Sequence, residues 1–406
     1  RVEGLAGLFK KFISSIAIRS ALAQARMKIS AVDTFVLGAD LASPFGFSQW
    51  YYQRRMNVIV KISTDEGIAG WGECYGPASL AAEAVNGFYR ELLIGLDPRQ
   101  HEQVWAHLWQ RSLDYARKGP MMAALSGIDI ALWDIKAKSA NMPLWMLLGG
   151  KGGAIPCYAT GMYFKPAMGE SEMMTALLKE ADGYIREGFR MIKIKIGKNI
   201  AFDKKLIIEF RKKFPDLCIA ADANHAYNFK EAVDIGRCLS DNGYAWFEEP
   251  LSPENIADHA RLRECVTVPI AGGECEQTRY GFAALANVHA LDIMQPDIAY
   301  CGGITEYQKI AAIASAAHID MMPHCWGLRI NQAVAASAIT ALPANPGRYE
   351  KREVSLEMDR TEHPVRDGIF SRWHEVKNGS LILNDAPGIG VDIDEALIKR
   401  FVPEAP

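Results

Sequence analysis

The sequence has little excess of charge of either sign. Among its 406 residues, 45 Lys and Arg stand against 48 Asp and Glu, so the formal net charge is −3. This balance gives no electrostatic reason to expect a nucleic acid or an anionic membrane as a partner. The sequence also lacks any run of about 18 uncharged apolar residues, so it predicts no membrane-spanning helix.

Paired cysteine motifs are missing as well. Eight cysteines are scattered without a C-x-x-C pair, a pattern typical of reduced, mostly buried thiols, and we expect a cytoplasmic protein. Two nucleotide-binding motifs are incomplete. Ile393 stands where a dinucleotide fingerprint that starts at Gly388 needs its third glycine, and Trp145 replaces the first glycine of a phosphate loop ending at Lys151.

What is present is the composition of a globular protein with a large core, since 49% of the residues are hydrophobic. Residues 1–26 carry five Arg or Lys, and we expect them to form a disordered or helical extension, although a transit peptide has a similar composition. From Met27 onward, apolar residues alternate with period two, with a hairpin turn at residues 64–67. Helical periodicity follows from about residue 80 to 148, so we predict an α+β domain over residues 27–150.

A different pattern occupies residues 151–360. Eight short apolar runs alternate there with helical stretches, which favours right-handed βαβ units and a parallel sheet. The length fits a (β/α)8-type barrel. A doubly wound sheet is the alternative, and the missing glycine-rich fingerprint disfavours it. We predict that a C-terminal segment, residues 361–406, follows the barrel.

A barrel enzyme places its active groups at the C-terminal ends of the strands. One ionisable residue ends each of seven successive predicted strands, and neighbours in this series are separated by 23 to 33 residues, about one strand–helix unit. We therefore expect one mouth to gather Lys195, Asp222, Glu248, Glu274, Asp297, His324 and Glu357.

Three consecutive members of this series are carboxylates. Hard oxygen ligands without a thiolate or an imidazole suit Mg²⁺, so we predict one Mg²⁺ per site, held by Asp222, Glu248 and Glu274. Zinc would need Cys275 and Cys325. Each of these cysteines directly follows a strand-end residue, and successive residues of a strand point to opposite sides, so zinc is disfavoured.

Candidate proton-transfer groups stand on either side of the three carboxylates. Lys193 and Lys195 point the same way, and a neighbouring cation and metal would keep Lys195 neutral and basic. His324 and Asp297 end adjacent strands and would form a dyad. Glu357, if protonated, would donate a hydrogen bond to a substrate carboxylate. This set predicts removal of a proton next to a carboxylate, with a divalent cation stabilising the enediolate.

The motifs K-I-K, D-A-N, E-E-P, A-G-G-E, Q-P-D and P-H-C-W-G resemble the enolase superfamily, in its mandelate racemase subgroup. The resemblance spans about residues 27–402. It implies a (β/α)7β modified TIM barrel and an N-terminal α+β capping domain completed by the C-terminal segment. It also implies a homo-oligomer, often an octamer.

The resemblance also implies roles for the candidate residues. Lys195 and His324 would be the acid/base catalysts, Asp297 the dyad partner and Glu357 an electrophilic partner, while Lys193 would lie against the substrate carboxylate. The three carboxylates would be the Mg²⁺ ligands.

Substrate choice is expected to depend on an aromatic loop, residues 45–55, that would close over the mouth from the capping domain. Arg54 and Arg55 in this loop would meet a distal carboxylate or hydroxyl groups. Further candidate substrate contacts are Asn224, His225, Tyr300 and Trp326.

Within the subgroup, the sequence is similar to those of acid-sugar dehydratases and aldarolactone cycloisomerases. These enzymes give 2-keto-3-deoxy acids from a sugar acid or its lactone. Three alternatives stay open. The same two bases would serve a racemase or epimerase of a 2-hydroxy acid, a strand-end lysine would serve a Schiff-base barrel aldolase, and a barrel can be retained without catalysis. No nucleic acid and no membrane is expected as a partner.

Overall fold

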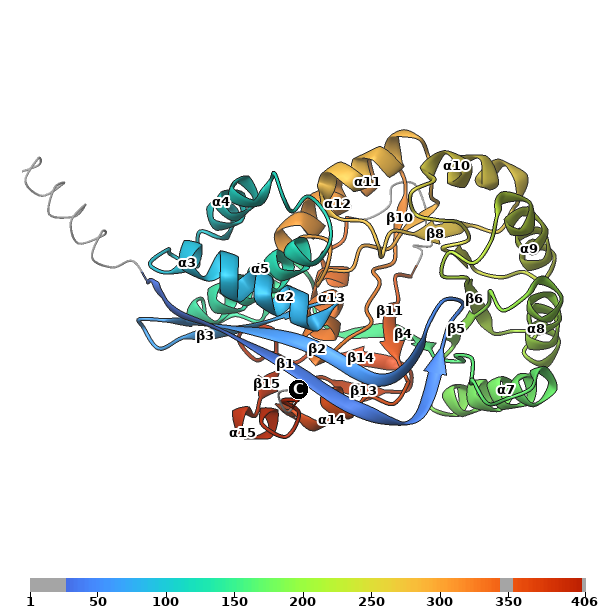
Figure 1. The fold of residues 1–406 in the computed structure, drawn as a ribbon, viewed down its shortest axis with the longest axis horizontal. Helices are drawn as coiled ribbons and strands as arrows, with labels where there is room; N and C mark the ends of the chain where they lie inside the picture. The colour runs from blue at the N-terminus through green and yellow to red at the C-terminus, as the bar shows by residue number, and fades with distance from the viewer. Residues whose placement is uncertain (1–26, 344–352, 404–406) are drawn as a thin grey trace, which may run out of the picture.

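The computed structural model describes residues 27–343 and 353–403, so the predicted extension at residues 1–26 lies outside the described residues. The chain forms an N-terminal sheet covered by helices, next to a larger assembly of alternating strands and helices (Figure 1). Its last segment returns beneath both parts. The exact limits of the domains stay a prediction.

The N-terminal part, which we call the capping domain, is built on one antiparallel sheet in the order β1 (Ile29–Gly46), β2 (Tyr51–Thr64) and β3 (Ala69–Cys74). The predicted turn at residues 64–67 joins β2 to β3. The helical elements that follow are α2 (Ala78–Ala84), the π-helix η1 (Val85–Tyr89), α3 (Arg90–Leu93), α4 (His101–Ser112), α5 (Pro120–Ser139) and α6 (Leu144–Leu147).

Helix α5 is the centre of the capping domain and is buried along almost its whole length. It packs directly on β3, and glycine makes this approach possible: a Cβ at Gly72 would lie 1.8 Å from the carbonyl oxygen of Gly127. The sheet and the helix thus come close enough to exclude water between them.

Eight strands form the second part, and they are the eight apolar runs of the sequence. They are β4 (Ala154–Thr160), β5 (Met191–Lys195), β6 (Cys218–Asp222), β7 (Phe247–Glu248), β8 (Ile270–Gly272), β9 (Ile293–Met294), β10 (Asp320–Met321) and β11 (Leu356–Asp359). Neighbours pair in parallel from β4 to β10, and β11 pairs with β4 on the other side. Within the described ranges, no backbone pairing joins β10 to β11, so the strand pairing is open between these two strands.

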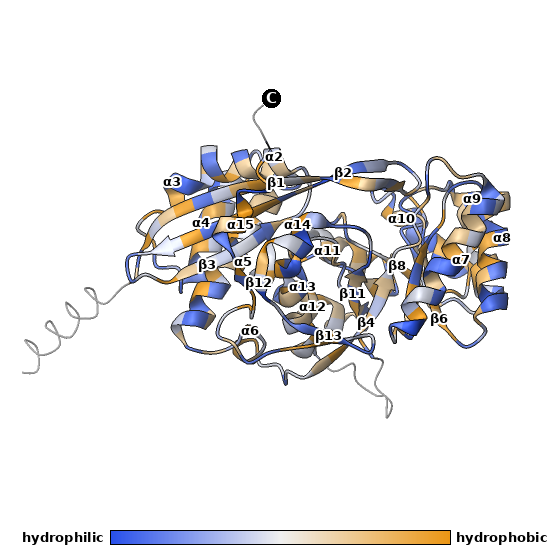
Figure 2. Ribbon diagram, turned by 90° about the horizontal axis from the view of Figure 1, so that it is seen from below, coloured by the Kyte–Doolittle hydropathy of each residue, from blue (hydrophilic) through white to orange (hydrophobic). Residues whose placement is uncertain are grey.

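One helix of the barrel follows each of the first seven strands. These helices are α7 (Glu170–Arg186), α8 (Ile200–Lys213), α9 (Phe229–Asp241), α10 (Ile256–Cys265), α11 (Thr278–Asn287), α12 (Gly303–Ala316) and α13 (Arg329–Thr340). Figure 2 shows hydrophilic and hydrophobic sides on α7, α8 and α9, as expected for helices that cover a sheet. The predicted (β/α)7β order is therefore confirmed.

The C-terminal segment contains α14 (Pro364–Gly368), β12 (Phe370–Arg372), β13 (Glu375–Lys377), β14 (Ser380–Ile382), β15 (Asp392–Ile393) and α15 (Glu395–Ile398). As expected, it returns to the capping domain: the Gly38 N–H donates to the carbonyl of Phe401 at 2.7 Å, and the Ile389 N–H donates to Asp134 Oδ1 at 2.9 Å. The sequence did not predict that β14 would extend the barrel sheet by pairing antiparallel with β4.

The β1–β2 hairpin reaches from the capping domain across the C-terminal ends of β5 and β6 (Figure 1). At its tip, Ser48 Oγ and Gln49 Nε2 donate to the Asn224 carbonyl at 2.9 and 2.7 Å. Gly46 exchanges two backbone hydrogen bonds with Phe164, which follows β4. The expectation that the loop at residues 45–55 closes over the mouth is confirmed.

All eight cysteines are free, as predicted. The expectation that most would be buried is wrong, because Cys218, Cys265 and Cys275 are exposed and Cys238 is half-buried. Throughout residues 27–343 and 353–403, every helix is too short or too polar to cross a membrane.

Candidate active site

The structure brings the seven predicted residues to one end of the barrel. Four of them lie in their strands: Lys195 ends β5, Asp222 ends β6 and Glu248 ends β7, while Glu357 lies within β11. Glu274, Asp297 and His324 follow β8, β9 and β10 by two or three residues. This is the edge at which barrel enzymes hold their active groups.

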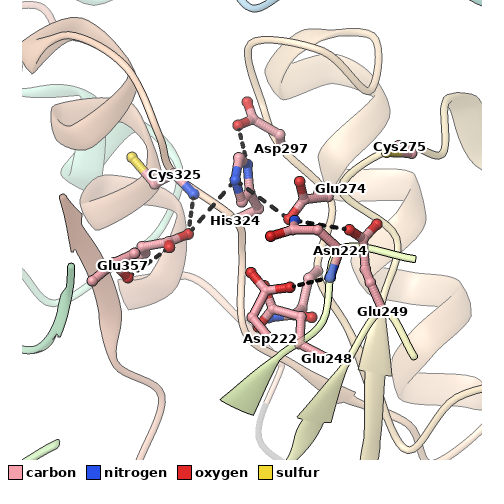
Figure 3. A network of polar contacts seen from close by, with 12 residues as sticks. Asp222, Asn224, Glu248, Glu249, Glu274, Cys275, Asp297, His324, Cys325 and Glu357 are labelled. Atoms are coloured by element: carbon pink, nitrogen blue, oxygen red, sulfur yellow. Dashed lines mark hydrogen bonds and ion pairs between the residues drawn. The ribbon is translucent and has the colours of Figure 1, made fainter. Parts of the chain in front are cut away.

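The carboxylate trio, Asp222, Glu248 and Glu274, is the centre of the site (Figure 3). One oxygen of each residue lies within 4.8 Å of the others, and all three side chains are buried. Three converging oxygen donors, without sulfur or imidazole nitrogen among them, fit a hard divalent cation such as Mg²⁺. Three buried carboxylates also repel one another, which such a cation relieves.

Glu248 is held in place by two neutral donors. Trp246 Nε1 and Gln295 Nε2 each donate to Oε2 at 2.8 Å, so Oε1 is left for Lys193 and for a cation. Burial raises the pKa of Glu248 despite the opposing effect of Lys193. Sequence reasoning missed Trp246 and Gln295, although each stands two residues from a predicted site residue on the same strand or strand end.

Lys195 lies at the Asp222 end of the carboxylate trio. Its ammonium contacts the Asp222 carboxylate and donates to Asn224 Oδ1 at 2.9 Å. Burial lowers the pKa of Lys195, but the charges of Asp222 and then Glu274 outweigh burial, so the net shift is upward. This direction is opposite to the neutral amine that the sequence predicts. A divalent cation on the same carboxylates would oppose the shift, because two positive charges repel each other.

His324 lies at the Glu274 end, and its predicted dyad with Asp297 is present. The Nδ1 atom is 2.6 Å from Asp297 Oδ2, so Nδ1 carries the shared proton. The Nε2 atom faces the carboxylate trio, 3.5 Å from Glu274 Oε2. Burial lowers the pKa of His324, but the carboxylates of Glu274, Glu357 and Asp297 outweigh burial and raise it to about 10.

Glu357 closes the site opposite Glu274. It accepts hydrogen bonds from Thr160 Oγ1 at 2.7 Å and from the Cys325 N–H at 2.9 Å, and Lys193 Nζ lies 2.9 Å away. Burial raises the pKa of Glu357, but Lys193 and His324 outweigh burial, so the net shift is downward. Three donors surround the Glu357 carboxylate, so this arrangement does not favour the protonated form that the conditional donor role requires.

Lys193 is fully buried between Glu248 and Glu357. Burial lowers its pKa, but these two carboxylates raise it well above its ordinary value. The ammonium thus balances part of the negative charge beneath the carboxylate trio.

The candidate substrate contacts divide into two groups. Asn224 and Trp326 lie at the mouth: Asn224 holds Lys195, and the ring of Trp326 is 5.1 Å from that of Tyr52 on the hairpin. Tyr300 reaches the same wall, with its ring 5.8 Å from that of Tyr75. His225 points away from the mouth, because its Nδ1 donates to the Leu251 carbonyl at 3.3 Å.

The two arginines differ sharply. Arg55 is buried, pairs with Asp359 at 2.8 Å and stacks over Trp326 at 3.9 Å, so it joins the hairpin to β11. Arg54 is half-exposed, 3.3 Å from Asp40. Both line a pocket of about 580 Å³ between β2, the β3–α2 loop and Trp326.

Tyr75 connects this pocket to the reaction centre and was not predicted. Its ring lies 5.4 Å from that of His324 and 6.4 Å from that of Trp326. Burial raises the pKa of Tyr75 well above its ordinary value, so the phenol stays neutral. Only its position, directly after an apolar strand of the capping domain, gives a signal in the sequence.

Comparison with known proteins decides the family. Residues 30–149 match the mandelate racemase / muconate lactonizing enzyme N-terminal domain, and residues 176–397 match the enolase C-terminal domain-like family. This chain belongs to the mandelate racemase / muconate lactonizing enzyme family of the enolase superfamily. Its D-galactarolactone cycloisomerase relative from Agrobacterium fabrum is 38% identical over 92% of this chain and 99% of that protein.

Other members of the family are also similar to this chain. An arabinonate dehydratase from Saccharolobus solfataricus is 33% identical over 85% of this chain and 90% of its own length. Among solved structures, a 3,6-anhydro-D-galactonate cycloisomerase from Zobellia galactanivorans has a TM-score of 0.84 and 38% identity, covering 93% of this chain and all of that one. A racemase from Streptomyces coelicolor, solved with bound magnesium, has a TM-score of 0.82 and 27% identity, covering 92% of this chain and 100% of that one.

Proposed function

We propose that this chain is a Mg²⁺-dependent lyase or isomerase, an acid-sugar dehydratase or an aldarolactone cycloisomerase. It takes the proton α to the carboxylate of a sugar acid or its lactone and gives a 2-keto-3-deoxy acid. One observation carries the proposal: the carboxylate trio lies between Lys195 at one end and the His324–Asp297 dyad at the other. The relatives named above support the substrate class.

The carboxylate trio would hold one Mg²⁺. When bound, the ion supplies positive charge that stabilises the substrate carboxylate as its α-proton leaves. Lys193 adds a fixed positive charge beneath the same place, because it is held by Glu248 and Glu357.

Two proton-transfer groups serve the two proton transfers of an elimination. One takes the α-proton, and the other returns a proton to the oxygen that departs from the β-carbon. Asn224 Oδ1 orients Lys195 Nζ, while Asp297 orients His324 so that Nε2 faces the reacting atoms. In a lactone, the departing oxygen stays attached to the rest of the molecule, so the same elimination opens the ring.

The walls of the mouth exclude water around these groups. The ring of Phe47, at the hairpin tip, lies 6.0 Å from Lys195 Nζ, and that of Tyr163 lies 5.0 Å from it. On the other side, Tyr75 packs edge-on against His324. A low-dielectric site strengthens the charge interactions on which proton removal depends.

A substrate screen tests the proposal. The full chain is incubated with Mg²⁺ and a library of mono- and diacid sugars and their lactones, and 2-keto product is measured. We expect turnover with a sugar acid or lactone, and its loss in Lys195→Ala and in His324→Asn. Absence of both turnover and solvent-deuterium exchange across the library would overturn the proposal.

Racemisation or epimerisation is the second candidate, because the two-sided arrangement would equally return a proton to the opposite face of the α-carbon. Deuterium that enters the α-position without formation of 2-keto product would favour it. A Schiff-base aldolase would be trapped on Lys195 by borohydride with substrate and would keep its activity in EDTA. Turnover that survives both Lys195→Ala and His324→Asn would favour a different site.

We also propose a homo-oligomer, in the octameric form that the family resemblance suggests, and a cytoplasmic location. The eight free thiols support a reducing compartment. Light scattering of the purified full chain gives the subunit number directly.

A further inference from the structure

A second group of metal-ligating side chains lies directly behind the carboxylate trio. We call it the outer cluster: His225, Glu249 and Cys275. Glu249 and Cys275 are the residues next to Glu248 and Glu274, and His225 follows Asp222 by three residues. Because successive residues at a strand end point to opposite sides, the same three strands that turn oxygen ligands inward turn these side chains outward.

Strand alternation predicts that Cys275 points away from the carboxylates, which disfavours a zinc site among them. It does point away, but it meets two other ligands. Cys275 Sγ lies 3.6 Å from His225 Nε2, and His225 Nε2 lies 3.1 Å from Glu249 Oε2. One ligand atom of each of the three residues lies within 4.8 Å of the others.

These distances match the edges of a tetrahedral zinc site. With bonds of about 2.0 Å to nitrogen and oxygen and about 2.3 Å to sulfur, neighbouring ligands stand about 3.3 Å apart for N–O and about 3.5 Å for N–S. The observed 3.1 and 3.6 Å lie close to both values. Two of the three edges therefore already have the length that a bound ion would impose, and the third, between Glu249 and Cys275, lies within 4.8 Å.

His225 is oriented for this purpose. The Leu251 carbonyl only accepts hydrogen bonds, so the contact at 3.3 Å fixes the proton on Nδ1. The Nε2 atom is therefore left to face Glu249 and Cys275. A carbonyl acceptor behind a ligating histidine is the usual support of metal sites.

Glu249 gives an independent indication. Glu249 is only 3% exposed, so its carboxyl is almost fully removed from water. Beyond its contacts with His225 and Cys275, the Glu249 carboxyl lies 3.5 Å from Asn224 Nδ2. A buried carboxyl that faces an imidazole and a thiol has the surroundings of a ligand rather than those of a structural ion pair.

The outer cluster also has room for a fourth ligand. All three residues line a cavity of about 30 Å³, together with His259. This volume holds one water molecule, and Cys275 is exposed, so solvent reaches the site.

We propose that the outer cluster binds one Zn²⁺ per chain, in addition to the ion of the carboxylate trio. Nitrogen, oxygen and sulfur donors together favour zinc over magnesium, whereas three carboxylates favour magnesium. On binding, bonds form from the metal to Nε2, to the Glu249 carboxylate and to Sγ. The thiol proton leaves to solvent, because sulfur binds the metal as the thiolate, and the histidine binds through its unprotonated Nε2.

The ion would connect the segments that follow β6, β7 and β8. Those segments also carry the carboxylate trio, so zinc would fix the spacing of the inner ligands. Because an ion that binds only the folded state stabilises it, zinc is expected to raise the melting temperature.

Metal titration of the full chain tests the proposal. The protein is stripped with chelator, saturated with Mg²⁺ to occupy the carboxylate trio, and titrated with Co²⁺ or Zn²⁺. We expect one equivalent of Co²⁺ with a near-ultraviolet thiolate charge-transfer band, not displaced by further Mg²⁺. Cys275→Ser should abolish the band, and His225→Ala or Glu249→Gln should weaken binding about tenfold or more.

Matched variants separate the two sites. Cys265→Ser removes another exposed thiol, at the end of α10, and should leave the Co²⁺ band unchanged. Asp222→Asn should weaken Mg²⁺ binding and keep the band. The proposal is overturned if Zn²⁺ and Mg²⁺ compete for one equivalent, or if Cys275→Ser and Glu249→Gln, both with native circular dichroism, bind as the unaltered chain does. These outcomes do not depend on the proposed reaction.

Discussion

At the scale of single residues, the His324–Asp297 dyad is positioned by contacts that reach back to the capping domain. Asn331 Nδ2 donates to Asp297 Oδ1 at 3.1 Å, and the Ala299 N–H donates to the same oxygen at 2.8 Å. The backbone N–H of Asn331 donates in turn to Glu73 on β3 at 3.0 Å. Glu73 thus holds the first turn of α13, from which the side chain of Asn331 orients the dyad.

Asn331→Ala should reduce kcat while leaving KM little changed, and it should cost about 2 kcal/mol of folding stability because a buried hydrogen bond to a carboxylate is lost. The substitution removes the side-chain donor that fixes Asp297 but keeps the backbone contact with Glu73. Misorientation of a catalytic group by about 1 Å costs on the order of a hundredfold in rate, so we expect a loss of about tenfold to a hundredfold in kcat. Steady-state kinetics with the substrate from the screen, beside thermal melting, measures both. A fall in melting temperature with unchanged kcat would make Asn331 a purely structural residue.

At the scale of elements, the β1–β2 hairpin is one of the parts of the capping domain that meet the reaction centre, beside Tyr75 after β3. Its tip is tight. A Cβ at Gly46 would lie 2.2 Å from the carbonyl oxygen of Trp50, so the turn at residues 47–50 closes only on glycine. The hydrogen bonds from Ser48 and Gln49 then fix this turn on Asn224, whose side chain holds Lys195.

Gly46→Ala should therefore lower kcat/KM about tenfold or more, because the turn must open and the tip must leave Asn224. Gly67→Ala is the matched control. It places a side chain at a φ of 79° in the other turn of the same sheet, where a Cβ meets nothing within 4 Å. The control should cost about 1 kcal/mol of stability and leave kcat/KM unchanged. Equal kinetic effects of the two substitutions would show that the hairpin tip has no part in substrate binding.

The C-terminal segment depends on a neutral histidine. His374 is buried, its Nδ1 accepts from the Asn384 N–H at 3.1 Å, and its Nε2 donates to the Ile389 carbonyl at 3.2 Å. Burial lowers the pKa of His374 to about 4. Protonation would place a second N–H against the Asn384 N–H, so one hydrogen bond that shapes the segment would be lost.

Acid should therefore destabilise the protein through His374. Because the folded-state pKa lies below the ordinary 6.5, the unfolded chain binds the proton more tightly between pH 6.5 and about 4. The contribution of neutral His374 to the free energy of unfolding is complete above pH 6.5. It is lost as the pH falls towards 4, by up to about 3 kcal/mol. Urea unfolding of the unaltered chain and of His374→Gln, which keeps one acceptor and one donor without titrating, measures it. Equal pH slopes in that window would contradict the assignment.

At the scale of the whole molecule, negative charge is concentrated at one point of a chain that is nearly neutral overall. The carboxylate trio, Asp297 and Glu357 are all buried within one mouth. Lys193, Lys195 and His324 balance only part of this charge. A divalent cation should therefore bind the folded protein far better than the unfolded chain.

Mg²⁺ should raise the melting temperature, and EDTA should lower it. At a concentration a hundred times its Kd, a ligand of the folded state contributes about 2.7 kcal/mol. Asp222→Asn removes one ligand and should abolish most of the shift, even if the variant itself is more stable because one buried charge is gone. Differential scanning calorimetry of both proteins, with and without Mg²⁺, measures the shift in melting temperature that the ion causes. An equal shift in the variant would place the ion elsewhere.

The sequence predicted the parts of the molecule that repeat. Each strand–helix unit carries its own apolar period and one polar residue at its end, so Asp222, Glu248 and His324 were found from spacing alone. Contacts between distant segments have no such period. The sequence therefore carried no sign of Thr160, which lies 197 residues from its partner Glu357. It did single out Arg55, but without its partner Asp359, 304 residues away. The outer cluster escaped for a related reason: alternation excluded Cys275 from one face without revealing what lies on the other.

The hydrogen bond from Ser48 to Asn224 joins residues 176 positions apart, so the entrance and the floor of the reaction chamber come from different halves of the chain. Substitution of the four residues at the hairpin tip would change which substrates enter the site. It would leave the acid/base groups below them intact. The architecture thus lets selectivity diverge between relatives while the underlying reaction is inherited.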